Sequence, residues 1–228
     1  MRILLLYIFF ALLSKSIFSA ALYVDVKSDA QTREIIGREE LNNFELLSYV
    51  HKTYHYSDAT GEHYFILTEN APKAGHATKI KAVDVLVNDN KFFKNVELSE
   101  EIERGSEGEI YFWTKYSYFY DLTNEGIITP VIVYGTNGLD ATNQGRIMVV
   151  AYYRNKKCEI EIFESDLDEG RGFLVDRDFY ALPGSIRKSI IDIIAKIEYD
   201  GNGYFPCNWR RAIEKNKTDI EAIGCSNY

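Results

Sequence analysis

Residues 44–68 read FELLSYVHKTYHYSDATGEHYFILT and predict a β-hairpin. Residues 44–56 are rich in Tyr, Val, Thr and Leu, and residues 63–68 form a second run of strand-favouring residues. Between the two runs, residues 57–61 (SDATG) have the composition of a tight turn, because Asp, Ser and Gly accept the backbone angles that turns require. The chain is therefore expected to fold around antiparallel pairing of neighbouring strands.

Similar segments recur along the chain, and clusters of Gly, Asn and Asp separate them. Polar and apolar residues alternate in residues 80–87, which is typical of a half-buried strand. The charged residues 97–109 are expected to form an exposed connection. Further strands are expected at residues 22–26, 110–120, 131–134, 146–153 and 158–163. About eight short strands at this spacing favour an antiparallel sheet over a parallel β–α–β array.

The C-terminal region changes to a helical period. Five isoleucines share one helical face, with Ser185 placed to cap the helix start: Ile186, Ile190, Ile193, Ile194 and Ile197. A second short helix is expected at residues 209–217. The predicted fold class is therefore α+β, a mostly antiparallel β-sheet with one or two C-terminal helices packed on it.

The first 21 residues have the pattern of a secretory signal peptide. A basic start at Arg2, the apolar residues 3–13 and the small-residue exit Ser19-Ala20-Ala21 predict cleavage after Ala21. An uncleaved N-terminal anchor is the alternative, although the apolar run is shorter than the roughly 20 residues that a membrane span needs. We therefore expect residues 22–228 to form a single β-rich domain that is periplasmic or secreted.

The charge balance bears on the partners of the protein. Its formal net charge is −8, and loss of Arg2 and Lys15 with the signal peptide makes the charge −10. Such a chain repels phosphate backbones, so a nucleic-acid partner is not expected. No segment after the signal peptide is apolar enough to predict a stable membrane span.

The chain has three cysteines, and export permits disulfides. Cys207 and Cys225 are close in sequence near the C-terminus and are the predicted pair. Cys158 is then left over at the start of a predicted strand, where a buried inert thiol is favoured over a catalytic one.

A candidate calcium loop follows the aromatic strand. Asp121, Thr123 and Glu125 place oxygen-bearing side chains at alternate positions, and Gly126 permits the sharp turn of such a loop. The usual acidic ligand at the twelfth position is replaced by an isoleucine, so Asp140 or Asn143 in the next loop is the candidate substitute. The alternative interpretation is a β-turn whose polar side chains bind their own backbone.

Two further clusters have both a functional and a structural interpretation. Trp113, Tyr116 and Tyr118 are candidates for an aromatic platform that stacks on sugar rings, although aromatic residues in strands more often pack in a core. His51, His55 and His63 could meet in a zinc site, although separate hydrogen-bonded histidines are the commoner arrangement.

Several stretches together resemble a known family. They are LYVD at 22–25, GREELN at 37–42, TYHYS at 53–57, LTENAP at 67–72 and PVIVYG at 130–135. The chain resembles a family of exported, uncharacterised enterobacterial proteins and is similar to a wider group labelled surface polysaccharide biosynthesis proteins. In that group the segment matching residues 121–126 often reads Asp-x-Asp-x-Asp-Gly. Asp121 and Gly126 match it, whereas Thr123 and Glu125 depart, which puts ion binding in doubt here.

Signatures of enzymes are sparse, because the chain contains no GxSxG, P-loop, GxGxxG or CxxC motif. We therefore expect a cell-envelope domain that is not an enzyme and that binds calcium or a glycan. Two alternatives stay open: an enzyme or accessory factor acting on surface or envelope polysaccharide, and a partner-binding or inhibitor protein.

Overall fold

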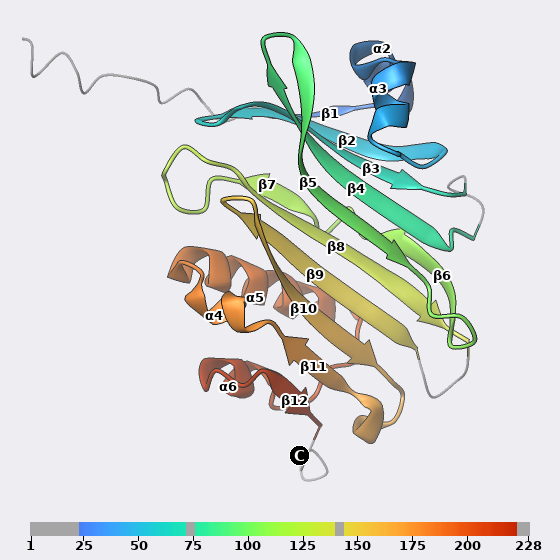
Figure 1. Cartoon of the computed structure of the whole chain (residues 1–228). Coiled ribbons are helices and arrows are strands. Elements are labelled where there is room, and N and C mark those ends of the chain that lie inside the picture. Colours follow the sequence, from blue (N-terminus) through green and yellow to red (C-terminus); the bar gives the residue numbers. More distant parts are fainter. Residues whose placement is uncertain (1–22, 72–75, 140–143, 223–228) are drawn as a thin grey trace, which may run out of the picture.

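The computed structural model describes residues 23–71, 76–139 and 144–222, and these form two β-sheets with helices on their outer faces (Figure 1). All strand pairs in it are antiparallel. The predicted α+β class with mostly antiparallel sheet is confirmed. The described residues contain twelve strands, more than the eight or so expected.

The first sheet is a five-stranded meander in chain order: β1 (Val24–Lys27), β2 (Tyr49–Asp58), β3 (Gly61–Glu69), β4 (Lys79–Asn88) and β5 (Lys91–Glu101). The predicted hairpin is confirmed, since Asp58 pairs with Gly61 and leaves a two-residue turn. A second tight turn joins β4 to β5, and its residues Asp89 and Asn90 have positive φ angles of 50° and 59°. The expectation that residues 97–109 form a connection is wrong in part, because residues 97–101 pair with β4.

The second sheet has seven strands: β6 (Glu107–Phe112), β7 (Tyr118–Tyr120), β8 (Thr129–Gly138), β9 (Gly145–Tyr153), β10 (Lys156–Glu164), β11 (Gly172–Val175) and β12 (Asp219–Glu221). Their order is β12-β11-β10-β9-β8-β6, and β7 also pairs with β8. The single strand predicted at residues 110–120 is in fact two strands, separated by a turn. Ser117 Oγ accepts a hydrogen bond from Val133 N at 2.9 Å, so a side chain replaces the backbone ladder there.

The two sheets pack face to face over an aromatic-rich core. Phe65 and Leu67 of β3 meet Ile132 and Tyr134 of β8 in this core. Val133, the β8 neighbour of both, points to the opposite face, against the C-terminal helices. Both faces of β8 are thus buried, which accounts for its continuous apolar sequence.

Helices cover both outer faces (Figure 1). α2 (Asp29–Ile36) and α3 (Arg38–Asn43) lie on the first sheet, and Ser28 and Gln31 close a capping box at the start of α2. The second sheet is covered by α4 (Arg177–Ala181), α5 (Gly184–Tyr199) and α6 (Trp209–Glu214), and a 3-10 turn, η1 (Asp168–Gly170), precedes β11.

The predicted isoleucine face of α5 is confirmed, since all five isoleucines are buried. The predicted cap is wrong, because Pro183 is the N-cap residue and no side chain caps the helix. The Pro183 carbonyl accepts hydrogen bonds from Ile186 N and Arg187 N, which places Ser185 inside the first turn.

Tyr54 provides a stability test of the inter-sheet core. Its hydroxyl is buried and finds no hydrogen-bond partner among the described residues, while its ring stacks on Phe119 with centroids 4.1 Å apart. Burial raises the pKa of Tyr54 to about 12. Because an unsatisfied buried hydroxyl is costly, Tyr54→Phe is expected to stabilise the protein by about 1 kcal/mol in urea unfolding. Tyr56→Phe is the matched control and should destabilise, because the Tyr56 hydroxyl lies 3.4 Å from Asp84. An equal decrease in the free energy of unfolding of Tyr54→Phe and Tyr56→Phe would contradict the prediction.

Candidate functional site

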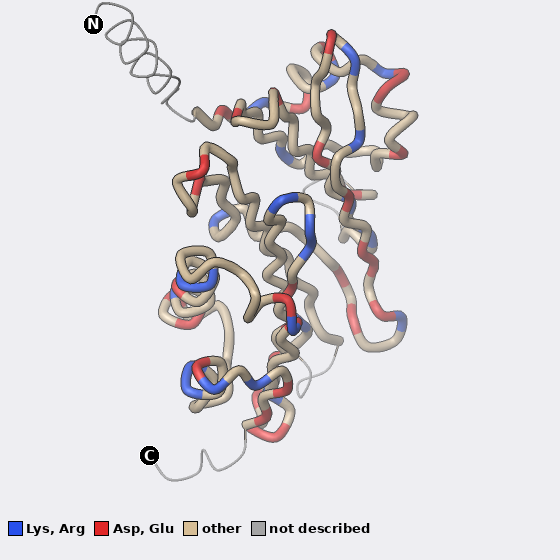
Figure 2. The backbone as a smooth tube through the Cα atoms, turned by 60° about the vertical axis from the view of Figure 1, so that its left-hand side comes forward, with Lys and Arg blue, Asp and Glu red and all other residues tan. Residues whose placement is uncertain are grey.

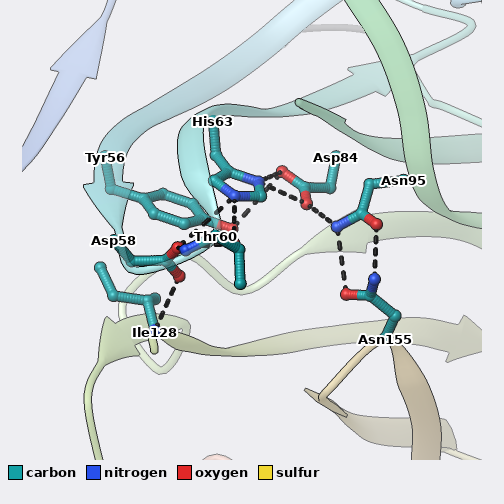
Figure 3. A network of polar contacts seen from close by, with 8 residues as sticks. All are labelled: Tyr56, Asp58, Thr60, His63, Asp84, Asn95, Ile128 and Asn155. Atoms are coloured by element: carbon teal, nitrogen blue, oxygen red, sulfur yellow. Dashed lines mark hydrogen bonds and ion pairs between the residues drawn. The ribbon is translucent and has the colours of Figure 1, made fainter. Parts of the chain in front are cut away.

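The candidate site is a cavity of about 220 Å³ at one end of the sandwich, where turns from both sheets meet (Figure 3). The β2–β3 hairpin, β4 and β5 supply its polar groups from one sheet. The loop between β7 and β8 and the turn between β9 and β10 complete it from the other sheet. The polar lining consists of Tyr56, Asp58, Thr60, His63, Asp84, Asn95, Tyr152, Arg154 and Asn155, and the apolar lining of Val96, Ile127, Ile128 and Pro130.

Asp58 holds the hairpin tip and fastens it to the opposite sheet. Its Oδ1 accepts hydrogen bonds from Thr60 N at 2.7 Å and from Thr60 Oγ1 at 2.6 Å. Its Oδ2 accepts a hydrogen bond from Ile128 N at 2.9 Å, across the gap between the sheets. Asp58 therefore orders the turn and positions the Thr60 hydroxyl at the cavity.

His63 lies at the centre of the cluster and is almost fully buried, with 3% of its surface exposed. Its Nδ1 is 3.0 Å from Asp84 Oδ2, and its Nε2 is 2.8 Å from Thr60 Oγ1. The ring of Tyr56 stacks on the imidazole with centroids 4.8 Å apart and planes 4° apart. Contacts at both nitrogens and at one face of the ring thus fix its orientation (Figure 3).

The hydroxyl of Thr60 couples His63 to a second carboxylate. This hydroxyl has one proton, so it can donate to Asp58 or to His63 but not to both. If it donates to Asp58, then His63 Nε2 must be the donor in its contact with Thr60. If it donates to His63, the imidazole is neutral and acts as the acceptor. The geometry therefore allows proton exchange between His63 Nε2 and the Thr60 hydroxyl, while Asp84 holds the other ring nitrogen.

A β-bulge brings an amide into the same site. Asp84 pairs with Val96 and Val85 with Lys94, so Asn95 is the extra residue of β5 and turns its side chain toward Asp84. Asn95 Nδ2 donates to Asp84 Oδ2 at 2.8 Å. Asn95 and Asn155 also exchange amide hydrogen bonds of 3.1 and 2.6 Å, which join the two sheets at the cavity. The positive φ of Asn155, 63°, belongs to the tight β9–β10 turn.

The electrostatics keep the Tyr56 phenol protonated. Burial, followed by the charges of Asp84 and Asp58, holds its pKa well above the usual value. A protonated phenol is a hydrogen-bond donor, and its oxygen lies 3.4 Å from Asp84 Oδ1. Asp84 is thus approached by three donors, from Tyr56, His63 and Asn95, which stabilises its charge in a buried position.

The predicted calcium loop forms the wall next to this cavity. Asp121 Oδ2 accepts a hydrogen bond from Gly126 N at 2.7 Å, and its Oδ1 accepts from Thr123 N at 3.1 Å and Glu125 N at 3.2 Å. Burial raises the Asp121 pKa, but these backbone donors outweigh it and leave that pKa lowered. Glu125 pairs with Arg154 at 2.9 Å. The candidates for the fourth ligand, Asp140 and Asn143, lie outside the described residues.

The described part of the chain contains no cluster of three or more His, Cys, Asp or Glu residues able to hold a metal ion. Calcium binding stays a prediction. The role that the geometry does show for the loop is structural, because Gly126 O accepts a hydrogen bond from Ala59 N of the hairpin tip at 2.8 Å.

The three candidate platform residues pack inward. Tyr116 is buried, and Trp113 and Tyr118 are half-buried against the helix-side core. The Trp113 ring lies against Gly135, where a Cβ atom would approach it to 3.0 Å. Tyr118 donates to Ser189 Oγ of α5 at 2.7 Å. This arrangement is that of core packing, the alternative that the composition favoured.

The histidines occupy separate places, and each lies beside its own carboxylate. His51 is 3.2 Å from Glu69, and His55 is 2.9 Å from Glu62. His63 is 3.0 Å from Asp84. The described structure thus contains no shared zinc site made of these histidines.

The cysteine and export predictions fall partly outside the described residues. Cys207 is disulfide-bonded, and Cys158 is a free, buried thiol whose pKa burial raises to about 12. Cys225 and residues 1–21, where a signal peptide is predicted, lie outside the described residues. Among the helices that are described, none is both long and apolar enough to cross a bilayer. Lys and Arg are spread among Asp and Glu along the trace (Figure 2).

Glu164 lies at the end of β10, and its burial is expected to make the stability of the protein depend on pH. Burial raises its pKa from 4.5 to about 7, while Tyr204 N donates to Oε1 at 3.3 Å. The folded state therefore binds this proton more tightly than the unfolded state, and stability falls as pH rises from about 4.5 to 7. Glu164→Gln should remove up to about 3 kcal/mol of this loss. The measurement is the free energy of unfolding in urea at pH 5 and at pH 8. If the difference between these two free energies were the same in Glu164→Gln as in the unaltered protein, the prediction would be contradicted.

The sequence singled out two parts of the site but did not join them. The hairpin turn with Asp58 and Thr60 was predicted, and His63 was considered as a zinc ligand. The sequence pattern of residues 80–87 identifies Asp84 only as a residue of a strand. It does not single out Asn95, because the position of a β-bulge depends on the partner strand. The one indication in the sequence that Asp84 belongs to a site is that an acidic residue occupies a position on the buried face of its strand.

This chain was compared with protein-family models, curated proteins and solved structures, and no match was found. The resemblance noted from sequence motifs therefore stays a prediction.

Proposed function

We propose that this protein is an exported binding domain of the cell envelope that holds a small, hydroxyl-rich ligand, such as one sugar unit of an envelope glycan, in the His63 pocket. The observation that carries the proposal is the preorganised polar wall of this pocket. Carboxylate, imidazole and amide groups are held there by mutual hydrogen bonds before any ligand arrives. Preorganised polar groups beside an apolar wall are typical of small-molecule sites.

The size and chemistry of the pocket support the same ligand class. Its volume of about 220 Å³ is below the roughly 300–1,000 Å³ of drug-sized sites, so it suits a compact ligand. Asn155 and Arg154 offer donors at the rim, while Ile127, Ile128 and Pro130 offer an apolar surface for the C–H face of a ring. The export signal and the family resemblance point to the envelope as the source of the ligand.

The test is a thermal-shift screen of the full chain across monosaccharides and envelope glycan fragments. A ligand present at a hundredfold excess over its Kd stabilises by about 2.7 kcal/mol, which is readily visible. Asn155→Gly should abolish the shift, because it removes the rim amide and keeps the positive φ accessible. Asn90→Gly is the matched control, since Asn90 occupies the β4–β5 turn with a φ of 59° and does not line the pocket. No shift across the panel, or equal shifts in both variants, rejects the proposal.

A second candidate function is hydrolysis of an ester on such a glycan. The observation that favours it is the pair of contacts at the two ring nitrogens of His63. A histidine held by a carboxylate at Nδ1 and by a hydroxyl at Nε2 has the geometry that activates a nucleophile. Thr60 Oγ1 would add to the ester carbonyl carbon and pass its proton to His63 Nε2. His63 would return that proton to the departing alkoxide, and water would then release the acyl group from Thr60.

The two candidates separate in one experiment with p-nitrophenyl acetate. Hydrolysis predicts nitrophenolate release, together with acetylation of the Thr60 peptide detected by mass spectrometry. Both signals should be lost in Thr60→Val and in His63→Gln. Release that survives in both variants, or no release in the unaltered protein, rejects the second candidate and leaves the binding function standing.

A further inference from the structure

A second cavity, of about 370 Å³, lies at the other end of the β2–β3 hairpin. The hairpin turn and the His63 pocket are at the Asp58–Gly61 end, whereas this cavity is at the end where Tyr49 pairs with Glu69. Its chemistry is carried by five lining residues: His51, Glu69, Glu109, Tyr111 and Phe112. Neither the glycan proposal nor the hydrolysis candidate uses any of these residues.

Glu69 is the unusual member of this set. Its surface is 5% exposed, and its Oε1 is buried without a hydrogen bond from any described residue. His51 Nδ1 lies 3.2 Å from this oxygen, close enough for an ion pair but without hydrogen-bond geometry. A buried carboxylate oxygen is costly unless a donor satisfies it. Because Glu69 lines the cavity, a hydrogen-bond donor bound there would lie beside this carboxylate.

The remaining lining defines the charge of that donor. Glu109 supplies a second carboxylate, which pairs with the exposed His76 at 2.7 Å and also bonds Asn137. None of the described lining residues is Lys or Arg. Tyr111 and Phe112 add aromatic rings, whose faces attract cations. The described lining thus combines two carboxylates with aromatic rings and contains no Lys or Arg.

We propose that this cavity binds an organic cation through a primary ammonium or guanidinium group. Such a group brings several N–H donors, so it can hydrogen-bond the Glu69 carboxylate and still contact the aromatic rings that line the cavity. A bare metal ion is not the expected ligand, because the described residues do not gather three protein ligands at any one place. A charge-assisted N–H···O bond to a buried carboxylate is among the stronger hydrogen bonds.

The test uses two probes of matched length, cadaverine and 1,5-pentanediol, with the full chain at constant ionic strength. Isothermal titration calorimetry should show saturable binding of cadaverine at one site and none of the diol. Glu69→Gln keeps the shape of the side chain and removes its charge, so cadaverine binding should weaken by about tenfold or more. Glu109→Gln should weaken it as well.

Glu62→Gln is the matched control, because Glu62 belongs to the same hairpin and also pairs with a histidine, but lies at the opposite end. Cadaverine binding should be unchanged in this variant. Equal weakening in Glu62→Gln and Glu69→Gln would show general attraction to an acidic protein and would overturn the proposal. Equal binding of the diol, or absence of saturable cadaverine binding, would overturn it too, since water would then satisfy Glu69. Circular dichroism of each variant confirms that it is folded.

Discussion

Replacing Asp84 with alanine is expected to destabilise the folded protein by about 3–5 kcal/mol, because each buried hydrogen-bond donor left without its acceptor costs roughly 1–3 kcal/mol. The side chain of Asp84 is 3% exposed and is approached by His63, Asn95 and Tyr56. Alanine would leave the buried donors of His63 and Tyr56 and the half-buried amide of Asn95 without their acceptor, and it would also open a cavity. The measurement is the free energy of unfolding in urea.

Two controls sharpen this result. Asp25→Ala removes an aspartate that is 34% exposed and pairs with Lys27, and it should change the free energy of unfolding little. Asp84→Asn keeps the size of the side chain and removes its charge, so its cost should fall between the two alanine variants. If Asp84→Ala were as stable as Asp25→Ala, the cluster around His63 would not be a tightly coupled network.

Phe65→Ala is expected to cost about 3–5 kcal/mol, as large-to-small changes of buried aromatic residues do. Phe65 is 1% exposed, and its ring lies 5.3 Å from Phe119 and 6.0 Å from Tyr152, which belong to the opposite sheet. Loss of the ring therefore removes contacts between the sheets as well as apolar burial. Thermal and urea unfolding should both show the loss.

Phe93→Ala is the control for Phe65→Ala, because Phe93 is 48% exposed on β5 and its loss should change stability little. The unfolding curves also test the single domain predicted for residues 22–228. One cooperative transition, shifted as a whole by Phe65→Ala, is expected if both sheets unfold together. Two transitions, of which only one moves, would show that the sheets are independent units.

Local sequence patterns were sufficient where the structure depends on neighbouring residues. The turn at residues 57–61 determines the β2–β3 hairpin, because its residues accept the angles that a two-residue connection needs. The isoleucine spacing determines which face of α5 is buried. By contrast, the single strand predicted over residues 110–120 is two strands, because the hydroxyl of Ser117 binds the backbone of β8, a partner that the local pattern does not reveal.

The candidate site could be predicted only in fragments for the same reason. His63, Asp58 and Thr60 belong to one hairpin, but Asp84 comes from β4, Asn95 from a bulge in β5 and Asn155 from a turn of the other sheet. The sequence by itself determined the β2–β3 hairpin, its turn and the buried face of α5, since side-chain period and turn chemistry are local. Only the tertiary structure decided how the strands divide into two sheets and which acid faces which histidine, because strand register and burial depend on residues distant along the chain.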